Sequence, residues 1–277
     1  MTATSAERPP LDETVLSAIS PDLVPGLLVE VVPQAPSTNA LVAERARAGA
    51  PEGLVVVTEH QTAGRGRLDR SWETPARSAL TFSVLLRPTA PTRSWPWLPL
   101  LAGYAVDKAL KADGFAAGVK WPNDVLIGDR KVAGILVERI ETEGGPCAVV
   151  GIGINVGLAP EELPVPTATS LAIEASHGSA GGSAPDRTRL LVDVLASLRE
   201  SYDAWQAGGD LAGMRLADSY ADACVTVGRQ VRVDLPDGSV LTGMATAIDP
   251  SGHLVVAGPD GPVAVGAGDV VHVRPAD

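Results

Sequence analysis

The stretch of this sequence best suited to binding an anion runs from residue 61 to residue 72 and reads QTAGRGRLDRSW. Its glycines, Gly64 and Gly66, let the backbone approach a ligand closely and expose its N–H groups. Planar, bidentate anion donors follow at alternating spacing: Arg65, Arg67 and Arg70. Trp72 offers a surface for a flat ring. The pattern favours a polyphosphate or an adenylate, with a solvated basic loop as the competing interpretation, and it is neither a Walker A nor a Rossmann fingerprint.

A second candidate cluster is Lys120-Trp121-Pro122-Asn123-Asp124, followed by Lys131 and Gly134. The chain has only 4 lysines against 18 arginines, so arginine is its general cation, yet two of the lysines fall in this short region. The choice indicates a site that needs a compact ammonium group where a planar guanidinium would not serve. Chance placement of the two lysines is the alternative.

A third motif, Gly151-Ile152-Gly153-Ile154-Asn155, places two glycines inside a predicted strand. A glycine within a strand marks either a β-bulge or the close approach of another group to the backbone. Taken alone, the motif favours the bulge.

Composition narrows the class of protein. The chain has 277 residues, 45% of them hydrophobic, and no apolar run near the roughly 20 residues that span a bilayer. The start, MTATSAERPPLDE, lacks the features of a signal peptide, so we expect a cytoplasmic protein without membrane association. A net charge of −11 argues against nucleic-acid binding, and two isolated cysteines argue against a disulfide framework or a zinc site.

Strands and helices alternate in the part of the chain that carries the three motifs. Runs of apolar and β-branched residues predict strands at 27–32, 54–58, 80–86 and 148–156, and a hairpin over 125–139 with its turn at Gly128-Asp129. Helices are predicted after an N-cap offered by Ser37-Thr38-Asn39, over 97–110, and after an N-cap at Asp186 as far as Gly208-Gly209. The order predicts an α+β or mixed α/β fold, with a mixed sheet covered on one face.

Three regions are expected along the chain. Residues 1–26 are predicted to form a loose N-terminal arm with at most a short helix, and residues 27–223 the domain that carries the motifs. Within that domain, the Gly- and Ser-rich segment 176–185 is predicted to be a flexible linker or loop. From residue 224 to residue 277, short alternating strands separated by turns predict a small β-barrel.

The three motifs, in this order and separation, closely resemble the signature blocks of the biotin–protein ligases: residues 59–72, KWPNDVLIGDRKVAGILVE and GIGINV. Ser37-Thr38-Asn39 is similar to the upstream biotin-contacting motif of that family. The resemblance covers roughly residues 27–273, is specific in the blocks and is weak between them. It implies a catalytic domain related in fold to class II aminoacyl-tRNA synthetases, followed by an SH3-like barrel.

The resemblance also implies a reaction in two steps. Biotin attacks the α-phosphorus of MgATP to give biotinyl-5′-AMP and pyrophosphate, and a lysine of the acceptor then takes the biotinyl group and releases AMP. The implied substrates are therefore biotin and ATP, with Mg²⁺ arriving on the nucleotide and no metal site built by the protein alone. The implied partner is a biotin carboxyl carrier protein or the carrier domain of a carboxylase.

Site roles follow from the same resemblance. Lys131 is expected to bridge the biotin carboxylate and the α-phosphate, and Arg67 to bind phosphate. Asp124 is expected either to orient or deprotonate the acceptor amine, or to hold Mg²⁺. The expected biotin-binding residues are Ser37, Thr38, Asn39, Gln61, Gly64, Arg65, Gly66, Arg67, Lys131 and Gly134. The expected ATP-binding residues are Arg67, Arg70, Trp72, Lys120, Asn123, Lys131 and Asn155. One departure from the family is Leu68-Asp69, where an acidic side chain enters the phosphate loop and is expected to face solvent.

Three rival functions are weighed against this one. Lipoate–protein ligases resemble one another through an arginine-rich Gly-Gly motif and a following His-Asp, and this sequence has neither. A biotin-sensing regulator that binds DNA would need a helix-turn-helix, and fewer than 30 residues precede the first predicted catalytic strand, so we expect the monofunctional class. An inactive homologue would lack essential residues in one of the signature blocks, and none of the blocks is disrupted in this way. We expect a monomer or weak dimer.

Overall fold

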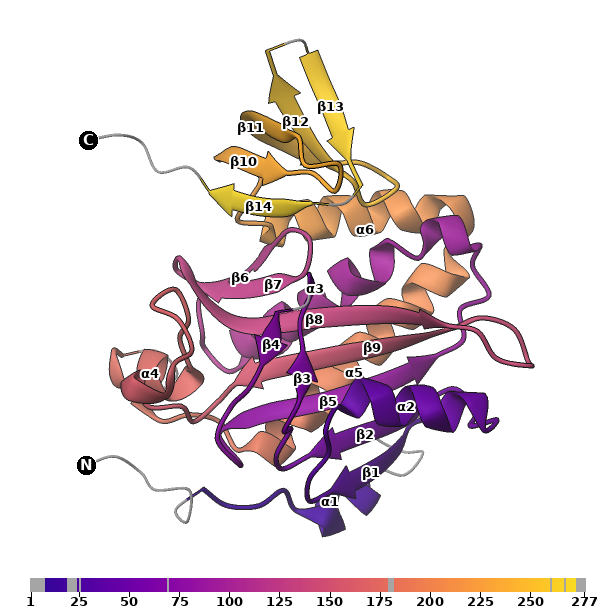
Figure 1. The fold of residues 1–277 in the computed structure, drawn as a ribbon, viewed down its shortest axis with the longest axis vertical. Coiled ribbons are helices and arrows are strands. Elements are labelled where there is room, and N and C mark those ends of the chain that lie inside the picture. The colour runs from indigo at the N-terminus through magenta and orange to yellow at the C-terminus, as the bar shows by residue number, and fades with distance from the viewer. Residues whose placement is uncertain are drawn as a thin grey trace.

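The structure, a computed structural model, describes residues 8–18, 24, 26–68, 70–178, 182–259, 261–266 and 268–272. Its centre is a seven-stranded sheet in the order β1-β2-β5-β9-β8-β7-β6 (Figure 1). Only β1 and β2 pair in parallel, and every other pair in this sheet is antiparallel. The strands are β1 Leu28–Val32, β2 Leu54–Thr58, β5 Ala79–Leu86, β6 Ala117–Lys120, β7 Asp124–Ile127, β8 Arg130–Ile140 and β9 Cys147–Asn155. The mixed sheet predicted from the sequence is confirmed.

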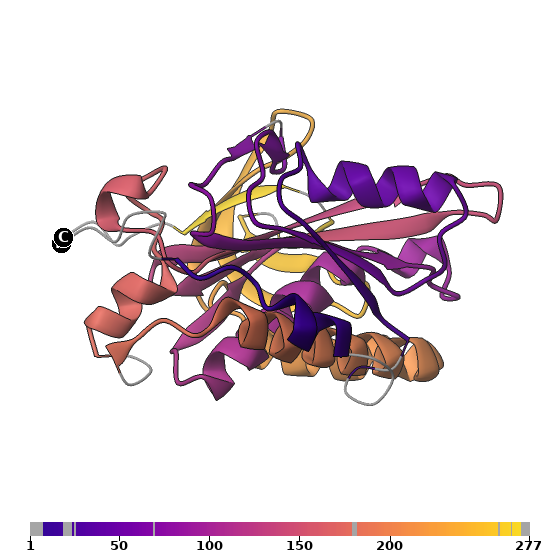
Figure 2. The same ribbon diagram turned by 90° about the horizontal axis from the view of Figure 1, so that it is seen from below.

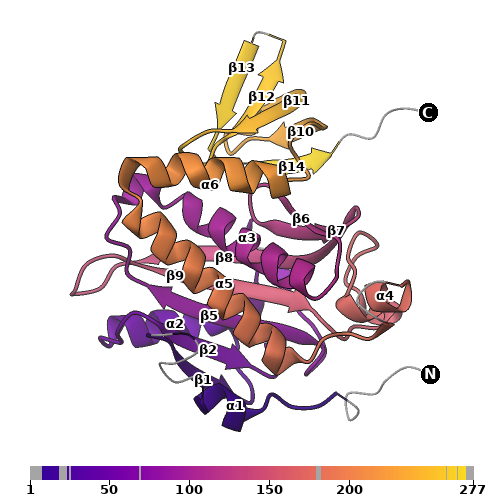
Figure 3. The same ribbon diagram turned by 180° about the vertical axis from the view of Figure 1, so that it is seen from behind.

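Helices cover one face of this sheet almost completely (Figures 2 and 3). They are α3 Trp97–Ala112, α5 Arg187–Ala207 and α6 Gly209–Ala223. The apolar face predicted for α3 is buried, with Leu98 and Leu101 at 2% and 1% exposure. On the other face lies α2 Thr38–Arg47, which packs on β2, β5 and β9. The expectation that helices cover only one face of the sheet is therefore wrong for the half under α2. The other half of this face carries the hairpin of β3 Gly64–Arg65 and β4 Ser71–Trp72, and the candidate site.

The C-terminal part forms a separate five-stranded antiparallel sheet in the order β13-β12-β11-β10-β14. Its strands are β10 Gln230–Asp234, β11 Val240–Ile248, β12 Leu254–Gly258, β13 Gly261–Val265 and β14 Asp269–His272. Two indole N–H groups tie it to the main domain, because Trp97 donates to the carbonyl of Pro250 at 2.9 Å and Trp121 to that of Gly252 at 3.0 Å. Trp121, only 1% exposed, is thus a structural residue.

The described residues of the N-terminal region pack more firmly than a loose arm. Its short helix, α1 Glu13–Ala18, was predicted, but Leu11 and Leu16 are buried and the backbone N–H of Leu11 donates to Glu59 Oε1 at 2.6 Å. Glu59 also forms a buried ion pair with Arg187 at 2.6 Å. The arm therefore covers charges that would otherwise lie at the surface, a long-range pairing that local sequence does not reveal.

Several elements escaped prediction because their local signals are weak. They are the two-residue strands β3 Gly64–Arg65 and β4 Ser71–Trp72, strand β6, helices α4 Leu171–Ser176 and α6, and the 3-10 turns η2 Thr92–Ser94 and η3 Pro160–Glu162. Gly208-Gly209 ends α5 as expected, but the chain then turns directly into α6. Part of the predicted linker, residues 179–181, lies outside the described residues. Within the described chain, no helix combines the length and apolar character needed to cross a membrane.

Candidate active site

A cavity of about 1600 Å³ opens on the sheet face that α2 leaves uncovered. Every site residue predicted from the sequence lines it except Gly64. Gly64 lies behind the wall, where a Cβ would collide with the side chain of Gln61 and the carbonyl of Trp72. The lining residues that were predicted are Ser37, Thr38, Asn39, Gln61, Arg65, Gly66, Arg67, Arg70, Trp72, Lys120, Asn123, Asp124, Lys131, Gly134 and Asn155. The fold thus gathers five separate sequence segments around one space.

One end of the cavity, the neutral end, is formed by uncharged side chains. They are Ser37, Thr38 and Asn39 at the start of α2, and Gln61 from the segment between β2 and β3. Ser37 is the N-cap of α2, the first of the three residues in which an N-cap was predicted. The backbone N–H of Thr38 donates to Gln61 Oε1 at 3.0 Å, and the hydroxyl of Ser83 on β5 lies 2.7 Å from that of Thr38. All are buried, so this end is rigid and its hydrogen bonds are largely made before any ligand arrives.

Asn39 serves the frame of the neutral end more than its surface. Its side-chain amide donates to Glu138 Oε2 at 2.7 Å, and Arg65 of the hairpin forms an ion pair with the same carboxylate at 3.2 Å. A Cβ on Gly151 would run into the Asn39 amide. This glycine is therefore needed for a close approach of α2 to β9.

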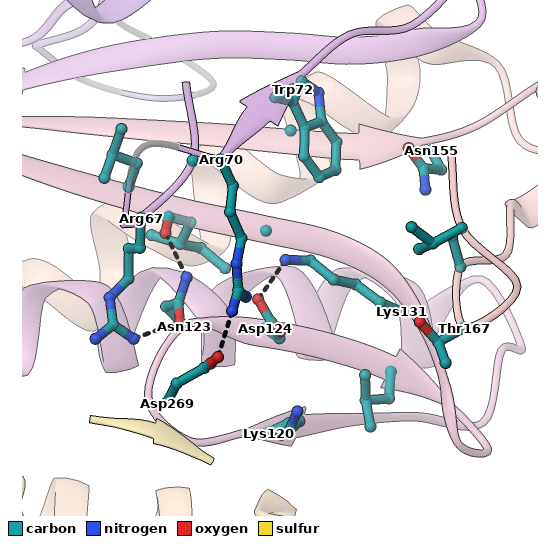
Figure 4. Close-up of a pocket in the computed structure, with 18 of the residues that line it drawn as sticks. Arg67, Arg70, Trp72, Lys120, Asn123, Asp124, Lys131, Asn155, Thr167 and Asp269 are labelled. Carbon is teal, nitrogen blue, oxygen red and sulfur yellow. Dashed lines mark hydrogen bonds and ion pairs between the residues drawn. The ribbon is translucent and has the colours of Figure 1, made fainter. Parts of the chain in front are cut away.

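Trp72 lies across the middle of the cavity, on the face of β8 and β9 (Figure 4). A Cβ on Gly153 would come within 2.6 Å of the indole, and one on Gly134 within 3.3 Å. The β8–β9 register runs without interruption through both glycines. The glycine motif thus marks close approach, and the bulge favoured from the motif alone is wrong. The indole Nε1–H is buried and has no hydrogen-bond partner among the described residues.

Lys131 projects into the cavity beside this indole. Its Nζ lies 2.6 Å from Asp124 Oδ1 and 5.8 Å from the centre of the Trp72 ring. Backbone hydrogen bonds on both sides hold the residue, with its N–H donating to Thr167 at 2.8 Å and its carbonyl accepting from Thr169 at 2.9 Å. The ammonium group is therefore fixed on a rigid strand and only about a third exposed.

Beyond Lys131 lies the charged end of the cavity, lined by Arg67, Arg70, Lys120, Asp124, Lys131 and Asp269 (Figure 4). Arg67 donates to Asn123 Oδ1 at 2.9 Å and to the carbonyl of Gly268 at 3.1 Å. Asn123 is held in turn by its own donation to Ile135 at 2.9 Å. Burial lowers the pKa of Arg67 from its usual range, opposed by the charges of Asp269 and Asp124.

Arg70 and Lys120 complete the set of cations at the charged end. Arg70 forms an ion pair with Asp269, the first residue of β14. The ammonium group of Lys120 makes no ion pair or hydrogen bond with any residue that the structure describes, whereas its backbone belongs to the β6–β7 ladder. Burial lowers the pKa of Lys120, while Asp124 and Asp269 oppose that shift. An anion entering this end would meet a lysine that has no competing carboxylate bound to it.

Three further residues discussed in the sequence analysis are Asn155, Leu68 and Asp69. Asn155 donates to the carbonyl of Thr169 at 2.9 Å and so holds the loop that flanks Lys131. Leu68 is exposed at the tip of the hairpin, with a left-handed φ of 55°. Its neighbour Asp69, expected to face solvent, lies outside the described residues.

Residues of the C-terminal sheet were missing from the sequence-based site. Asp269, Arg229 and His272 all line the cavity. Burial, with the nearby charges of Lys120 and Arg229, lowers the pKa of His272 to about 4. No local pattern singles these residues out, because each is one polar position in an ordinary alternating strand or turn. No group of three or more potential metal ligands occurs among the residues described.

Two family models match the chain. Residues 31–155 match the Biotin/lipoate A/B protein ligase family, and residues 226–273 match the biotin protein ligase C-terminal domain. The first match contains all three sequence motifs up to Asn155. The second covers the strands β10 to β14.

The chain is also similar to individual proteins, both in sequence and in structure. The biotin–[acetyl-CoA-carboxylase] ligase of Mycobacterium tuberculosis is 40% identical, over 99% of this chain and 100% of that protein. The bifunctional ligase/repressor BirA of Bacillus subtilis is 34% identical over 79% of this chain and 66% of its own length. Among solved structures, the biotin protein ligase from Aquifex aeolicus in complex with biotin and ATP aligns with a TM-score of 0.74 and 26% identity, over 89% of this chain and 98% of that one.

Proposed function

This chain belongs to the biotin protein ligase family, and we propose on that basis that it is an ATP-dependent ligase that attaches biotin to a lysine of a carrier protein. The observation that carries the proposal is the position of Lys131. It lies between a neutral, rigid end of the cavity and an end rich in cations, where a carboxylate and a phosphate would meet.

The neutral end suits biotin. Apart from its carboxylate tail, biotin is uncharged, and its ureido group needs hydrogen-bond donors and acceptors without charge. The polar groups at the start of α2 and on Gln61 provide these, while Trp72 and the glycine-bearing strands supply an apolar wall. Because these groups are buried and already positioned, little conformational entropy is lost when the ligand binds.

The first step joins two anions. An oxygen of the biotin carboxylate bonds to the α-phosphorus of ATP, the bond to the bridging oxygen breaks, and pyrophosphate leaves with the electron pair. Lys131 stabilises the charge that develops between the two groups, and Arg67 and Arg70 bind the phosphates. Such preorganised electrostatic groups typically contribute about 10²–10³ in rate each. Mg²⁺ would enter on the nucleotide and supply further charge neutralisation there.

The second step needs a neutral amine on the acceptor, although a free lysine has a pKa of about 10.4. Asp124, which is bound to Lys131 at 2.6 Å, is the carboxylate at the reacting centre. We assign it to orienting Lys131 before ATP binds and to accepting a hydrogen bond from the incoming amine afterwards. The amine nitrogen then attacks the carbonyl carbon of the adenylate. The bond from that carbon to the phosphate oxygen breaks, AMP leaves with the electron pair, and the amine loses its extra proton to solvent.

The acceptor protein, the domain organisation and the cellular location are part of the same proposal. The acceptor is the carrier domain of a carboxylase, the class of enzyme in the name of the M. tuberculosis relative. Residues 27–223 form the catalytic domain and residues 224–277 a second domain that closes the charged end. We also propose that the protein acts in the cytoplasm as a monomer or weak dimer, without binding DNA.

The test is transfer of biotin to a carrier domain. The purified chain is incubated with biotin, MgATP and a carboxylase carrier domain, beside the same domain with its target lysine replaced by arginine. We expect a mass increase of one biotin on the first domain only, with one AMP released for each transfer. No mass increase on either domain, from folded protein, would reject the proposed function.

A further inference from the structure

The cavity continues past Lys131 along a row of charged residues that crosses the sheet. Lys131 lies on β8, Asp124 on β7 and Lys120 on β6. Asp124 and Lys120 are direct register partners, so their side chains lie on the same face. Adjacent strands are about 4.8 Å apart, which places the Lys120 strand about 10 Å from that of Lys131. Figure 4 shows these three side chains facing the same space.

The segment after α6 extends this row beyond the edge of the sheet. Cys224 forms an isolated parallel bridge with Val119, and the N–H of Val225 donates to the carbonyl of Val119 at 2.9 Å. Thr226 accepts from the N–H of Trp121 at 3.2 Å. The segment therefore runs beside β6 and delivers Arg229 to the wall of the cavity that Lys120 also lines. The charges of both residues act on His272, which lies between these segments of the wall.

Contacts on two sides hold Arg229 in this position. Its guanidinium donates to Asp129 at 2.8 Å and lies 3.4 Å from Nδ1 of His272. The other ring nitrogen of His272 is 3.1 Å from the hydroxyl of Thr226, which is fully buried. Because a guanidinium can only donate, Nδ1 acts as the acceptor and Nε2 carries the proton. The low pKa of His272 keeps the ring neutral and this arrangement intact near pH 7.

The direction of the first chemical step points to this wall. In an in-line displacement the leaving group departs opposite to the attacking atom. If the carboxylate comes from the neutral end, over β5 and β9, the leaving group is directed the other way, over β7 and β6. Lys120 and Arg229 lie at the end of that path.

We propose that Lys120 and Arg229 form a subsite for the pyrophosphate that leaves in the first step, with His272 positioning Arg229. The inference rests on the proposed function. It adds Arg229, which precedes the C-terminal sheet, to the residues that bind the phosphates of ATP. The ion pair between Arg229 and Asp129 lies near the surface, with both side chains about half exposed, so it is weak. A pyrophosphate carries more charge than one carboxylate and would displace it.

Two measurements test this subsite, and neither depends on transfer to an acceptor. Calorimetry measures inorganic pyrophosphate binding, with Mg²⁺, to the full chain and to Arg229→Ala. Pyrophosphate exchange into ATP with biotin present gives the KM for pyrophosphate. Because a hydrogen bond to a charged group is lost, we expect both the Kd and this KM to rise about 10-fold in Arg229→Ala. Biotin affinity should not change.

Control variants separate this role from a structural one. Arg232→Ala removes an exposed arginine of β10 that pairs with Asp234 and does not line the cavity, and it should behave as the parent. His272→Ala should weaken pyrophosphate binding less than Arg229→Ala does, since it acts through Arg229. Arg229→Lys should recover part of the affinity.

The outcomes for the subsite and for the proposed function are distinct. A parent protein that binds no pyrophosphate, or an Arg229→Ala variant within twofold of the parent, would overturn the subsite. Exchange that does not depend on biotin would reject the proposed function instead, while the direct binding measurement would still decide on the subsite.

Discussion

The two ends of the cavity are built on different principles. The neutral end consists of buried, uncharged groups that bind one another through short-range contacts around the start of α2. The charged end consists of cations held by carboxylates and carbonyls from distant parts of the chain, including β14. A rigid neutral end selects its ligand by shape and hydrogen bonding. The charged end can exchange its internal ion pairs for phosphate.

This comparison predicts that substitutions will separate cleanly by end. Variants of the neutral end should affect biotin and leave the nucleotide parameters alone, and variants of the charged end should do the reverse. Mixed effects would mean that the two ends are coupled through Trp72, which touches both β8 and β9 between them.

Among the variants that test the separation of the two ends, Arg67→Ala at the charged end is expected to have the largest effect. Arg67 donates hydrogen bonds both to Asn123 and to the carbonyl of Gly268, so its guanidinium is held in place at the charged end before a ligand binds. We expect kcat/KM for ATP in the exchange reaction to fall by about 100-fold. The Kd for biotin, measured by calorimetry without nucleotide, should stay within twofold. An equal loss in biotin affinity would contradict the separation of the two ends.

Gln61→Ala should produce the converse pattern. It removes the acceptor for the buried N–H of Thr38, and an unsatisfied buried donor costs about 1–3 kcal/mol, shared between stability and ligand binding. We expect the Kd for biotin to rise about 10-fold, with the KM for ATP unchanged. Gln206→Ala, which removes an exposed hydrogen bond to Thr89, is the matched control. An ATP defect in Gln61→Ala would count against a separate neutral end.

Asp269→Asn tests how the C-terminal sheet contributes to the charged end. The change frees Arg70 from its ion pair with β14 but keeps the size of the side chain. Because the arginine is mostly exposed, the pair is weak, and we expect the KM for ATP to change by only two- to five-fold, roughly the range of surface ion pairs. The difference from the parent should shrink at high salt. A salt-independent difference would indicate a disrupted fold around β14.

The last prediction concerns acid stability and His272, and it involves no catalytic parameter. Its folded pKa of about 4 lies below the ordinary value, so between the two the unfolded chain binds a proton that the folded chain does not. The free energy of unfolding should therefore fall as the pH drops from about 6.5 to about 4. His272→Gln should lose less stability over this window in urea titrations, whereas His177→Gln, at an exposed position, should match the parent. Equal losses in all three proteins would refute a neutral His272.

The neutral end was largely predictable from sequence, because its signals are local. An N-cap was predicted within Ser37-Thr38-Asn39 from residue type and position, and the structure assigns it to Ser37. The strands that carry Gly134 and Gly153 were predicted from their apolar pattern. The hairpin turn at Gly128-Asp129 was predicted for the same reason. Local rules of capping, alternation and turns are sufficient where a residue acts within its own element.

The charged end was only half predictable. Its arginines and lysines were found through their motifs, but Asp269 and Arg229, which hold or extend the set, come from the C-terminal region. Nothing in the residues around them distinguishes them from other polar positions of small strands. Their role depends on how the segment that leads into the C-terminal sheet, Cys224 and Val225, runs beside β6, a long-range contact that sequence spacing does not encode. The packing of the Trp72 ring against Gly134 and Gly153 was not predicted for the same reason.

The central claim is that Lys131 promotes adenylation of biotin between these two ends. The most direct test is pyrophosphate exchange into ATP with biotin, with lipoate and with neither, for the parent and Lys131→Ala. We predict exchange that requires biotin and falls by at least about 100-fold in the variant, while biotin still binds the variant. Exchange supported by lipoate alone, or exchange that persists without Lys131, would contradict the account.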